Sequence, residues 1–239
     1  MNVILFEPAE MGRPLPRLDP RAQHLLAVLQ RAEGDAFDAG VVDEGLGKAR
    51  VREITADAVN FDYTPGPAMA RRPEVHLLVG LTRPQTARDI LRDGTTLGVT
   101  ALTFVFSERA DPNYAASTLW SSGEWRRHVL AGAAQAFDPR LPEVRWGVPL
   151  AEAAKLSAAG EQRLALDLYE AAGPLADVTV AASQPLVLAV GPERGWASAD
   201  RQLLREQGFQ LVRLTLPVLR VETAVVAALS VLSARRAPA

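Results

Sequence analysis

The pattern of hydrophobic and polar positions divides the chain into two regions. Before residue 70, short apolar runs separated by turn residues predict strands at residues 3–6, 36–42, 49–55 and 58–63. Residues 21–32 carry alanine and leucine at helical spacing after Asp19-Pro20, a favourable helix start. Short strands at this spacing predict a small β-barrel domain over residues 1–70. Residues 64–73, rich in proline and glycine, are interpreted as the linker that follows.

After the linker, apolar runs alternate with helical patterns. Strands are predicted at residues 74–81, 100–106, 143–148, 163–168, 185–190 and 210–216. Helices are predicted at residues 84–97, 113–137 with a break at 121–123, 149–158, 199–207 and 221–234. This alternation is typical of an α/β domain with a mostly parallel sheet, here residues 71–239.

Composition narrows the class of protein. No apolar run approaches the roughly 18 residues of a membrane span, and the first residues lack a signal-peptide pattern, so we expect no membrane association. The chain has no cysteine, which excludes disulfides, thiolate zinc sites and cysteine nucleophiles and suits a cytoplasmic protein. No histidine, aspartate or glutamate cluster has convincing ligand spacing, so we predict no metal.

Charge is unevenly distributed along the chain. The formal net charge is -2, and the acidic excess lies before residue 70 while the remainder is slightly basic. Nucleic-acid-binding proteins are often basic, so the slightly negative net charge argues mildly against a nucleic-acid-binding protein. All basic residues except Lys48 and Lys155 are arginines, whose planar guanidinium suits phosphates and bases.

The first stretch that indicates chemistry is PLVLAVGPERGW, residues 185–196. A short apolar strand stops at two glycines and a proline, and a helix follows. In open α/β sheets, ligands bind beyond the carboxyl ends of the strands. The loop at residues 191–195 is therefore a candidate small-molecule site, although a plain strand-to-helix turn explains the same residues.

The second stretch is LTLPVLRVETA, residues 214–224. Arg220, Glu222 and Thr223 stand where a strand has ended and an otherwise apolar helix begins. Glu222 or Thr223 as a helix cap, and Arg220 as an ion-pair partner of Glu222, are the alternative interpretations. Two such loops near the C-terminus make a two-sided pocket a reasonable expectation.

Five short motifs in a fixed order carry a resemblance to a known family. They are HLLAVLQRAEGD (residues 24–35), LGV with SER (97–99, 107–109), AAQ with PEV (133–135, 142–144), GPERG (191–195) and VLRVETA (218–224). Together they resemble the RsmE-type small-subunit ribosomal RNA uridine-N3 methyltransferases of the SPOUT superfamily. The last two motifs are specific in this order and spacing, and the match covers essentially the whole chain.

The resemblance implies an N-terminal PUA-like RNA-binding barrel and a C-terminal trefoil-knotted α/β domain that binds S-adenosylmethionine and forms a homodimer. The implied substrate is ribosomal RNA or the small ribosomal subunit. The implied cofactor-binding residues lie at the end of one strand and in the two motif loops: Leu166, Leu168, Val190, Gly191, Pro192, Glu193, Gly195, Leu214, Leu216, Leu219 and Thr223.

Methylation at N3 of uridine would need two kinds of side chain. The N3 proton must be removed or the resulting anion stabilised, and N3 must be held in line with the sulfonium carbon. Arg220 is the candidate for orientation and charge stabilisation, and Glu222 for the base, although Glu222 could instead hold Arg220. Arg31, Arg109 and Arg194 are the candidates for RNA contact.

The chain departs from the family pattern at several positions. Arg194 replaces a glycine of the loop, and a side chain there could point to solvent, contact RNA or crowd the cofactor. Other departures are Gln30, Thr96, Ala134, Asp138, Thr215 and Pro217. Three interpretations stay open: an active uridine methyltransferase, a related enzyme with another RNA target, or a binding protein without transfer activity.

Overall fold

The computed structural model describes residues 3–155, 160–181 and 183–236, and these form two compact units. Unit 1 runs to Arg71 and includes the separate segment Ala133–Leu141. Unit 2 comprises Arg72–Gly132 and the chain from Pro142 onward. Helix α4 (Trp125–Ala136) supplies residues to both units.

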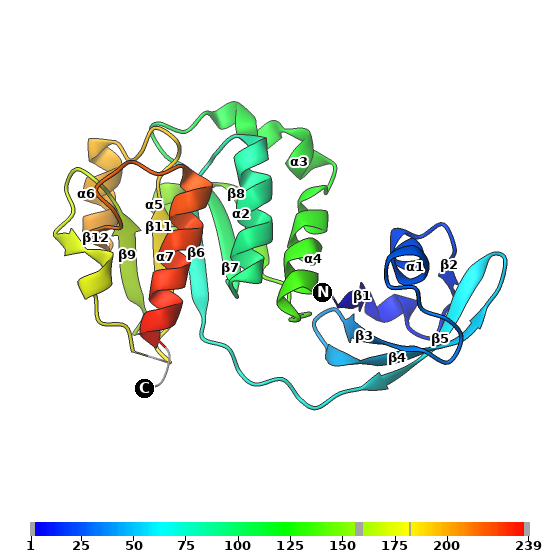
Figure 1. The fold of residues 1–239 in the computed structure, drawn as a ribbon. Helices are drawn as coiled ribbons and strands as arrows, with labels where there is room; N and C mark the ends of the chain where they lie inside the picture. The colour runs from blue at the N-terminus through cyan, green and yellow to red at the C-terminus, as the bar shows by residue number, and fades with distance from the viewer. Residues whose placement is uncertain (1–2, 156–159, 182, 237–239) are drawn as a thin grey trace. The chain divides into compact units, whose positions relative to one another are not determined.

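Unit 1 is built on a five-stranded sheet in the order β1-β3-β4-β5-β2, in which β1 and β3 are parallel and the other pairs antiparallel (Figure 1). Its elements are β1 (Ile4–Phe6), η1 (Pro8–Glu10), β2 (Leu15–Pro16), α1 (Pro20–Gln23), η2 (His24–Val28), β3 (Ala36–Val41), β4 (Gly45–Ile54) and β5 (Ala58–Pro65). Ala22 and Leu25 pack with apolar side chains of the strands and form the core of the unit.

The helix predicted at residues 21–32 is shorter and less regular than expected. Only Pro20–Gln23 is α-helical, and His24–Val28 forms a π-helix in which the Leu29 amide donates to the His24 carbonyl at 2.9 Å. Asp19 caps the start, as its position before Pro20 predicted, by accepting from the Arg21 amide at 2.8 Å. Gln30, with φ +50°, takes the left-handed conformation that stops helix propagation.

Unit 2 contains a seven-stranded sheet in the order β10-β12-β9-β11-β6-β7-β8, and every neighbouring pair is parallel. The strands are β6 (Val75–Gly80), β7 (Ala101–Phe106), β8 (Glu143–Pro149), β9 (Gln162–Leu166), β10 (Gly173–Pro174), β11 (Leu186–Val190) and β12 (Gln210–Arg213). The other elements are α2 (Pro84–Thr96), η3 (Pro112–Ala116), α3 (Thr118–Ser121), α5 (Leu150–Ala153), η4 (Leu175–Asp177), α6 (Ser198–Glu206) and α7 (Val221–Arg236). The predicted α/β class with a parallel sheet is confirmed.

Strand β11 lies at the centre of this sheet, between β6 and β9, and all five of its side chains are buried. Helices α2 and α7 lie side by side on one face (Figure 1). On the other face, α5 and α6 share a buried cluster with Val187 and Ala189 of β11. A strand that is covered on both faces must be apolar throughout, which explains the unbroken LVLAV sequence.

Several predicted boundaries were wrong, and local hydrogen bonds explain the main ones. Strand β9 ends at Leu166 rather than 168, because the Asp167 side chain turns the backbone. Strand β12 ends at Arg213 rather than 216. The region 113–137 is η3, α3 and α4, with the interruption after Ser121 that the sequence indicated. Helix α5 covers only Leu150–Ala153, and the end of the helix predicted at 149–158 lies outside the described residues.

No helix in the described part of the chain is long and apolar enough to cross a membrane. Within the same residues, no group of three or more histidine or acidic side chains is placed to hold a metal ion.

His76 of β6 lines a cavity of about 350 Å³ at the sheet edge where the strands begin. Its Nε2 lies 2.8 Å from the Thr103 hydroxyl. Burial, reinforced by the positive charge of Arg145, lowers the pKa of His76 from 6.5 to about 4. Between pH 6.5 and about 4, the His76 ring is therefore mostly neutral in the folded protein and mostly protonated in the unfolded chain.

We expect His76 to make the protein less stable as the pH falls below 6.5. Because its folded pKa is lowered, the penalty is absent at pH 7.5 and accumulates toward the folded value. Between pH 7.5 and 4.5 the wild type should lose about 2 to 3 kcal/mol more unfolding free energy than His76→Gln. Urea denaturation of both proteins at the two pH values measures this difference, and equal losses would contradict it.

Candidate functional site

A cleft of about 850 Å³ opens in unit 2 where β9 and β11 end and the chain has left β12. Three segments supply most of its walls: the residues after β9, the glycine loop after β11, and the connection from β12 into α7. This is the carboxyl edge of a parallel sheet, where α/β proteins place ligands. The volume lies within the range of small-molecule pockets.

The glycine loop, residues 191–195, needs glycine for close packing and for backbone conformation. A Cβ on Gly191 would lie 3.2 Å from backbone atoms of Gly195 and Trp196. The Gly195 amide closes a turn by donating to the Pro192 carbonyl at 2.7 Å, and Gly195 has φ +66°. Pro192 in turn rests on Gly80, where an added Cβ would come within 2.3 Å of the proline ring. The loop is thus held close to the ends of β6 and β11.

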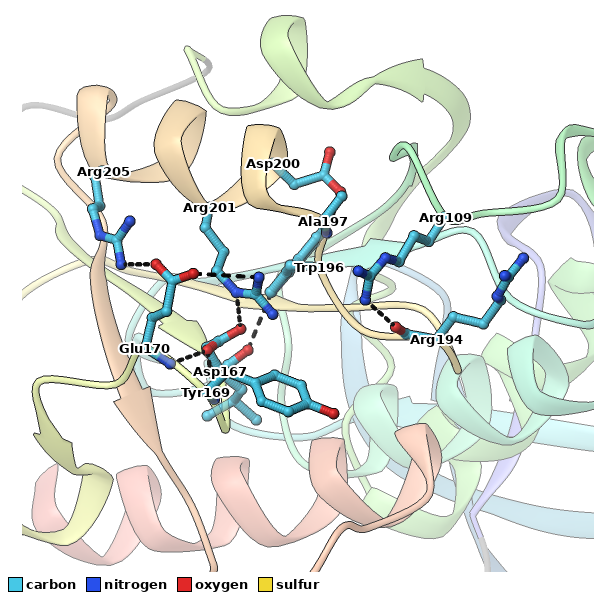
Figure 2. Close-up of polar contacts among 11 residues, drawn as sticks. Arg109, Asp167, Tyr169, Glu170, Arg194, Trp196, Ala197, Asp200, Arg201 and Arg205 are labelled. Atoms are coloured by element: carbon cyan, nitrogen blue, oxygen red, sulfur yellow. Dashed lines mark hydrogen bonds and ion pairs between the residues drawn. The ribbon is translucent and has the colours of Figure 1, made fainter.

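Arg194 occupies a position of this loop that tolerates a side chain. Among the described residues, the non-glycine positions with positive φ are Gln30, Asp43 and Phe137, so Arg194 needs no glycine-like backbone. Its side chain is exposed at the cleft. Its carbonyl accepts a hydrogen bond from Arg109 Nη1 at 3.1 Å, which joins the glycine loop to the loop after β7 (Figure 2).

The end of β9 is attached to the same loop and to α6. Trp196 Nε1 donates to the Leu166 carbonyl at 3.1 Å, and this indole is fully buried. The next residue, Asp167, accepts from the Tyr169 and Glu170 amides through Oδ1 at 2.8 and 2.7 Å. Such an aspartate turn redirects the chain and gives the cleft wall a defined backbone.

A buried ion pair lies behind this wall. Arg201 of α6 donates from Nε to Asp167 Oδ2 at 2.7 Å, and the two side chains expose only 6% and 3% of their surface. Arg201 Nη1 also reaches Glu170 at 3.5 Å, and Glu170 accepts from Arg205. Figure 2 shows these side chains as one connected group at the end of β9. Every charge in the group faces an opposite charge, which a buried pair requires.

The opposite wall is the start of α7. Arg220 precedes the first helical residue and Glu222 lies in the first turn, with 3.9 Å between Arg220 Nη1 and Glu222 Oε1. The Arg220 side chain is 86% exposed, whereas that of Glu222 is 25% exposed. At this distance and exposure the pair contributes little to folding, so the arginine is free to turn toward a ligand.

Known proteins match nearly the whole length of this chain. A family model described as an RNA methyltransferase domain matches residues 70–233. The ribosomal RNA small subunit methyltransferase E of Treponema pallidum is 31% identical over 98% of this chain and 91% of its own length. The chain belongs to the ribosomal RNA small subunit methyltransferase E family. The resemblance carried by the five sequence motifs is therefore confirmed.

Solved structures of low sequence identity share the fold of this family member. A probable rRNA-methyltransferase from Porphyromonas gingivalis has a TM-score of 0.81 at 18% identity, covering 98% of both chains. The methyltransferase E from Neisseria gonorrhoeae, solved bound to S-adenosylmethionine, has a TM-score of 0.77 at 23% identity, covering 96% of this chain and 95% of that one.

The methyltransferase fold brings most of the predicted site residues into one cleft. Those that line it are Leu166, Leu168, Val190, Gly191, Pro192, Glu193, Arg194, Gly195, Leu214, Leu219, Arg220 and Glu222. Leu216 and Thr223 are outside this lining, and both are exposed. Arg109 touches the glycine loop without lining the cleft, and Arg31 belongs to unit 1, where its Nε is buried without a hydrogen-bond partner.

Some lining residues were not indicated by the sequence patterns, among them Asp167 and Tyr169 after β9 and Arg201 of α6. Trp196, the last residue of the stretch 185–196 that the sequence did indicate, also lines the cleft. The sequence contained a feature that could have indicated Asp167, because a charged residue directly follows a predicted buried strand. It contained no such feature for Arg201, since a single arginine on an amphipathic helix is ordinarily at the surface.

Two of the family departures have local explanations. The Thr96 hydroxyl of α2 lies 3.0 Å from the Arg92 carbonyl of its own helix and 3.2 Å from the Gly132 carbonyl of α4, and it is the hydrogen-bond donor to both. It therefore links the two helices. Thr215 Oγ1 donates to the Pro217 carbonyl at 2.8 Å and shapes the connection that leads to α7. These residues therefore have structural partners of their own where the family pattern has other side chains.

Proposed function

We propose that this protein transfers a methyl group from S-adenosylmethionine to N3 of a uridine in small-subunit (16S) ribosomal RNA. The observation that supports this most strongly is the cleft itself: the glycine loop and the Arg220–Glu222 pair, far apart in sequence, line the same cavity. The chain's family membership and the ribosomal RNA named for its relatives give the substrate class.

The cleft suits an adenosine-containing cofactor. Its walls bring apolar side chains such as Leu166, Leu168 and Leu219 together with the glycine loop and with charged side chains. Apolar side chains can hold a neutral adenine, and a few polar groups can specify its orientation. S-adenosylmethionine supplies an electrophilic methyl group on a sulfonium, and the chain needs only to hold it in line with N3.

Side chains of this protein are proposed to accept the N3 proton and to stabilise the negative charge on the uracil. When N3 attacks, the N3–H bond breaks, an N3–methyl bond forms and the methyl–sulfur bond breaks. Glu222 is the proposed acceptor of the N3 proton, and it is half-buried at the start of α7. Arg220, whose side chain is 86% exposed, is the proposed group that stabilises the negative charge developing on the uracil oxygens.

The remaining site residues are assigned to RNA and cofactor contact. Arg194 and Arg109 are proposed to contact RNA phosphates, because their exposed side chains come from adjoining loops beside the cleft. Arg31 is proposed as an RNA contact of unit 1. Leu216 and Thr223 are proposed to contact the cofactor only after the connection to α7 adjusts around it.

The finer architecture is proposed to follow that of the family. Residues 1–70 are proposed as a PUA-like RNA-binding barrel, supported by the five-stranded sheet of unit 1, and residues 71–239 as the catalytic domain. A trefoil knot in unit 2 is proposed from the family resemblance, and the all-parallel sheet of unit 2 is the part of that architecture the structure supports. The exposed apolar side chains Val218 and Val226 support a homodimer through this domain, and ribosomal RNA as substrate supports a cytoplasmic location.

Calorimetry combined with reverse transcription tests the proposed function. The purified protein should bind S-adenosylmethionine and S-adenosylhomocysteine but not NAD. Because N3-methyluridine blocks base pairing, ribosomal RNA from a deletion strain should lose one reverse-transcription stop that the wild-type strain shows. Small subunits from that strain should regain the stop after incubation with protein and cofactor. Absence of affinity for both sulfur ligands would refute the proposal, and cofactor binding with an unchanged stop pattern would indicate another RNA target.

A further inference from the structure

Tyr169 presents an unusual aromatic surface inside the cleft. It is the third residue after β9, lines the cleft, and exposes 76% of its surface. The rings of Phe104, Trp120 and Trp196, by contrast, are buried in the unit. An exposed ring inside a ligand cleft is a ready stacking surface for another flat ring.

Two groups hold this ring in place. The Asp167 carboxylate fixes the backbone by accepting from the Tyr169 amide at 2.8 Å. The Arg201 guanidinium lies over the ring, with Cζ 5.3 Å from its centroid, and is itself bonded to Asp167 (Figure 2). One face of the ring is therefore covered by a cation, and the high exposure of Tyr169 leaves the other face available.

The charges next to the ring favour a neutral partner. Arg201 is paired with Asp167, and Arg205 is paired with Glu170, so the group behind Tyr169 has no net charge. A phosphate placed there would meet two carboxylates along with the two guanidiniums. The other cleft arginines, Arg83, Arg194 and Arg220, come from other segments of the chain.

We propose that Tyr169 forms an aromatic wall that stacks on the adenine of the cofactor, and that the Arg201–Asp167 pair positions this wall. The inference rests on the proposed methyltransferase function and adds a binding residue that the sequence motifs did not indicate. Adenine fits better than the target uracil, because Tyr169 directly continues the segment of Leu166 and Leu168 that is proposed to hold the cofactor. The uracil must instead reach the Arg220–Glu222 pair at the start of α7.

The test is cofactor affinity in variants of the full chain. Tyr169→Ala should raise the Kd for S-adenosylmethionine roughly ten- to hundredfold, the range for loss of one stacked base. Tyr169→Phe keeps the ring and should restore the affinity to within about twofold of wild type. Leu18→Ala, which removes a comparably exposed apolar side chain from unit 1, is the control and should leave the Kd unchanged.

Two further measurements separate stacking on adenine from other roles. 5′-Methylthioadenosine carries the same base without the amino-acid portion, so Tyr169→Ala should weaken its binding by the same factor. Arg201→Lys keeps the ion pair but loses the flat guanidinium. It should raise the KM for the cofactor about two- to fivefold, with kcat at saturating cofactor unchanged.

The outcomes distinguish this inference from the proposed function. A wild-type protein that does not bind S-adenosylmethionine overturns both. Wild-type binding with an unaltered Kd in Tyr169→Ala overturns only the aromatic wall. The aromatic wall is also overturned if 5′-methylthioadenosine binds wild type and Tyr169→Ala with equal affinity, or if Tyr169→Ala weakens RNA binding and not cofactor binding. Because Tyr169 is mostly exposed, its truncation should leave the thermal unfolding midpoint close to that of wild type.

Discussion

Replacement of Arg220 by alanine should reduce the rate of methyl transfer roughly 100- to 1,000-fold while the cofactor still binds. A hydrogen-bond donor that stabilises charge in the transition state is typically worth this much. The Arg220 side chain is 86% exposed and its distance to Glu222 is 3.9 Å, so the fold does not depend on it. Single-turnover methylation of small-subunit RNA gives the rate, and calorimetry gives the cofactor Kd.

Arg127→Ala is the matched control for this variant. Arg127 is also mostly exposed, at 75%, and also pairs with a glutamate, Glu124, at 3.1 Å, but it lies on α4 away from the cleft lining. Removal of the Arg127 side chain should leave the methyl-transfer rate within about twofold of the wild-type rate, as expected for a surface ion pair. Equal rates for Arg220→Ala and wild type would remove Arg220 from the mechanism, and a parallel loss of cofactor affinity would make it a binding residue instead.

Asp167→Ala should cost about 3 to 5 kcal/mol of unfolding free energy, the largest stability effect expected in the cleft. The carboxylate is 3% exposed and accepts from Arg201 and from two backbone amides. Its removal leaves the buried Arg201 without its main counter-charge, since Glu170 reaches it only at 3.5 Å. Urea unfolding at neutral pH measures the difference.

Two further variants make the stability prediction specific. Glu170→Ala removes a carboxylate that is 39% exposed and should cost under about 1 kcal/mol. Asp167→Ala combined with Arg201→Met removes both buried charges together and should recover much of the loss, because no unpaired charge remains. A cost below about 1 kcal/mol for Asp167→Ala alone would show that the pair does not stabilise this edge of the sheet.

The ends of elements were the least predictable features of the fold. Strand β9 was expected to reach residue 168, yet the Asp167 carboxylate captures two amides and stops it at Leu166. The helix expected at 21–32 becomes a π-helix after Gln23. Apolar periodicity reports which residues are buried, whereas the end of an element depends on side chains that compete for backbone groups.

In the candidate site, too, some features could be predicted from local sequence patterns and others could not. Its two loops were recognisable because glycine, proline and charged residues interrupt apolar runs. Gly191 does pack against the Gly195 backbone, and Arg220 and Glu222 do lie at the start of α7. Arg201 was not recognisable, because its partner Asp167 is 34 positions away and belongs to a different element. Tyr169 was not recognisable for the same reason, since its stacking partner is that arginine.

The sequence by itself determined the parallel α/β unit, its buried strand β11, the family, and the two loops where chemistry was expected. These features follow from local patterns: apolar runs, turn residues and motif order. Only the tertiary structure decided that both loops line one cleft, that Arg194 is compatible with its turn, and that a buried ion pair supports Tyr169. Those features depend on strand order, which places β9 beside β11 and β12, and strand order is set by packing among residues distant in the chain.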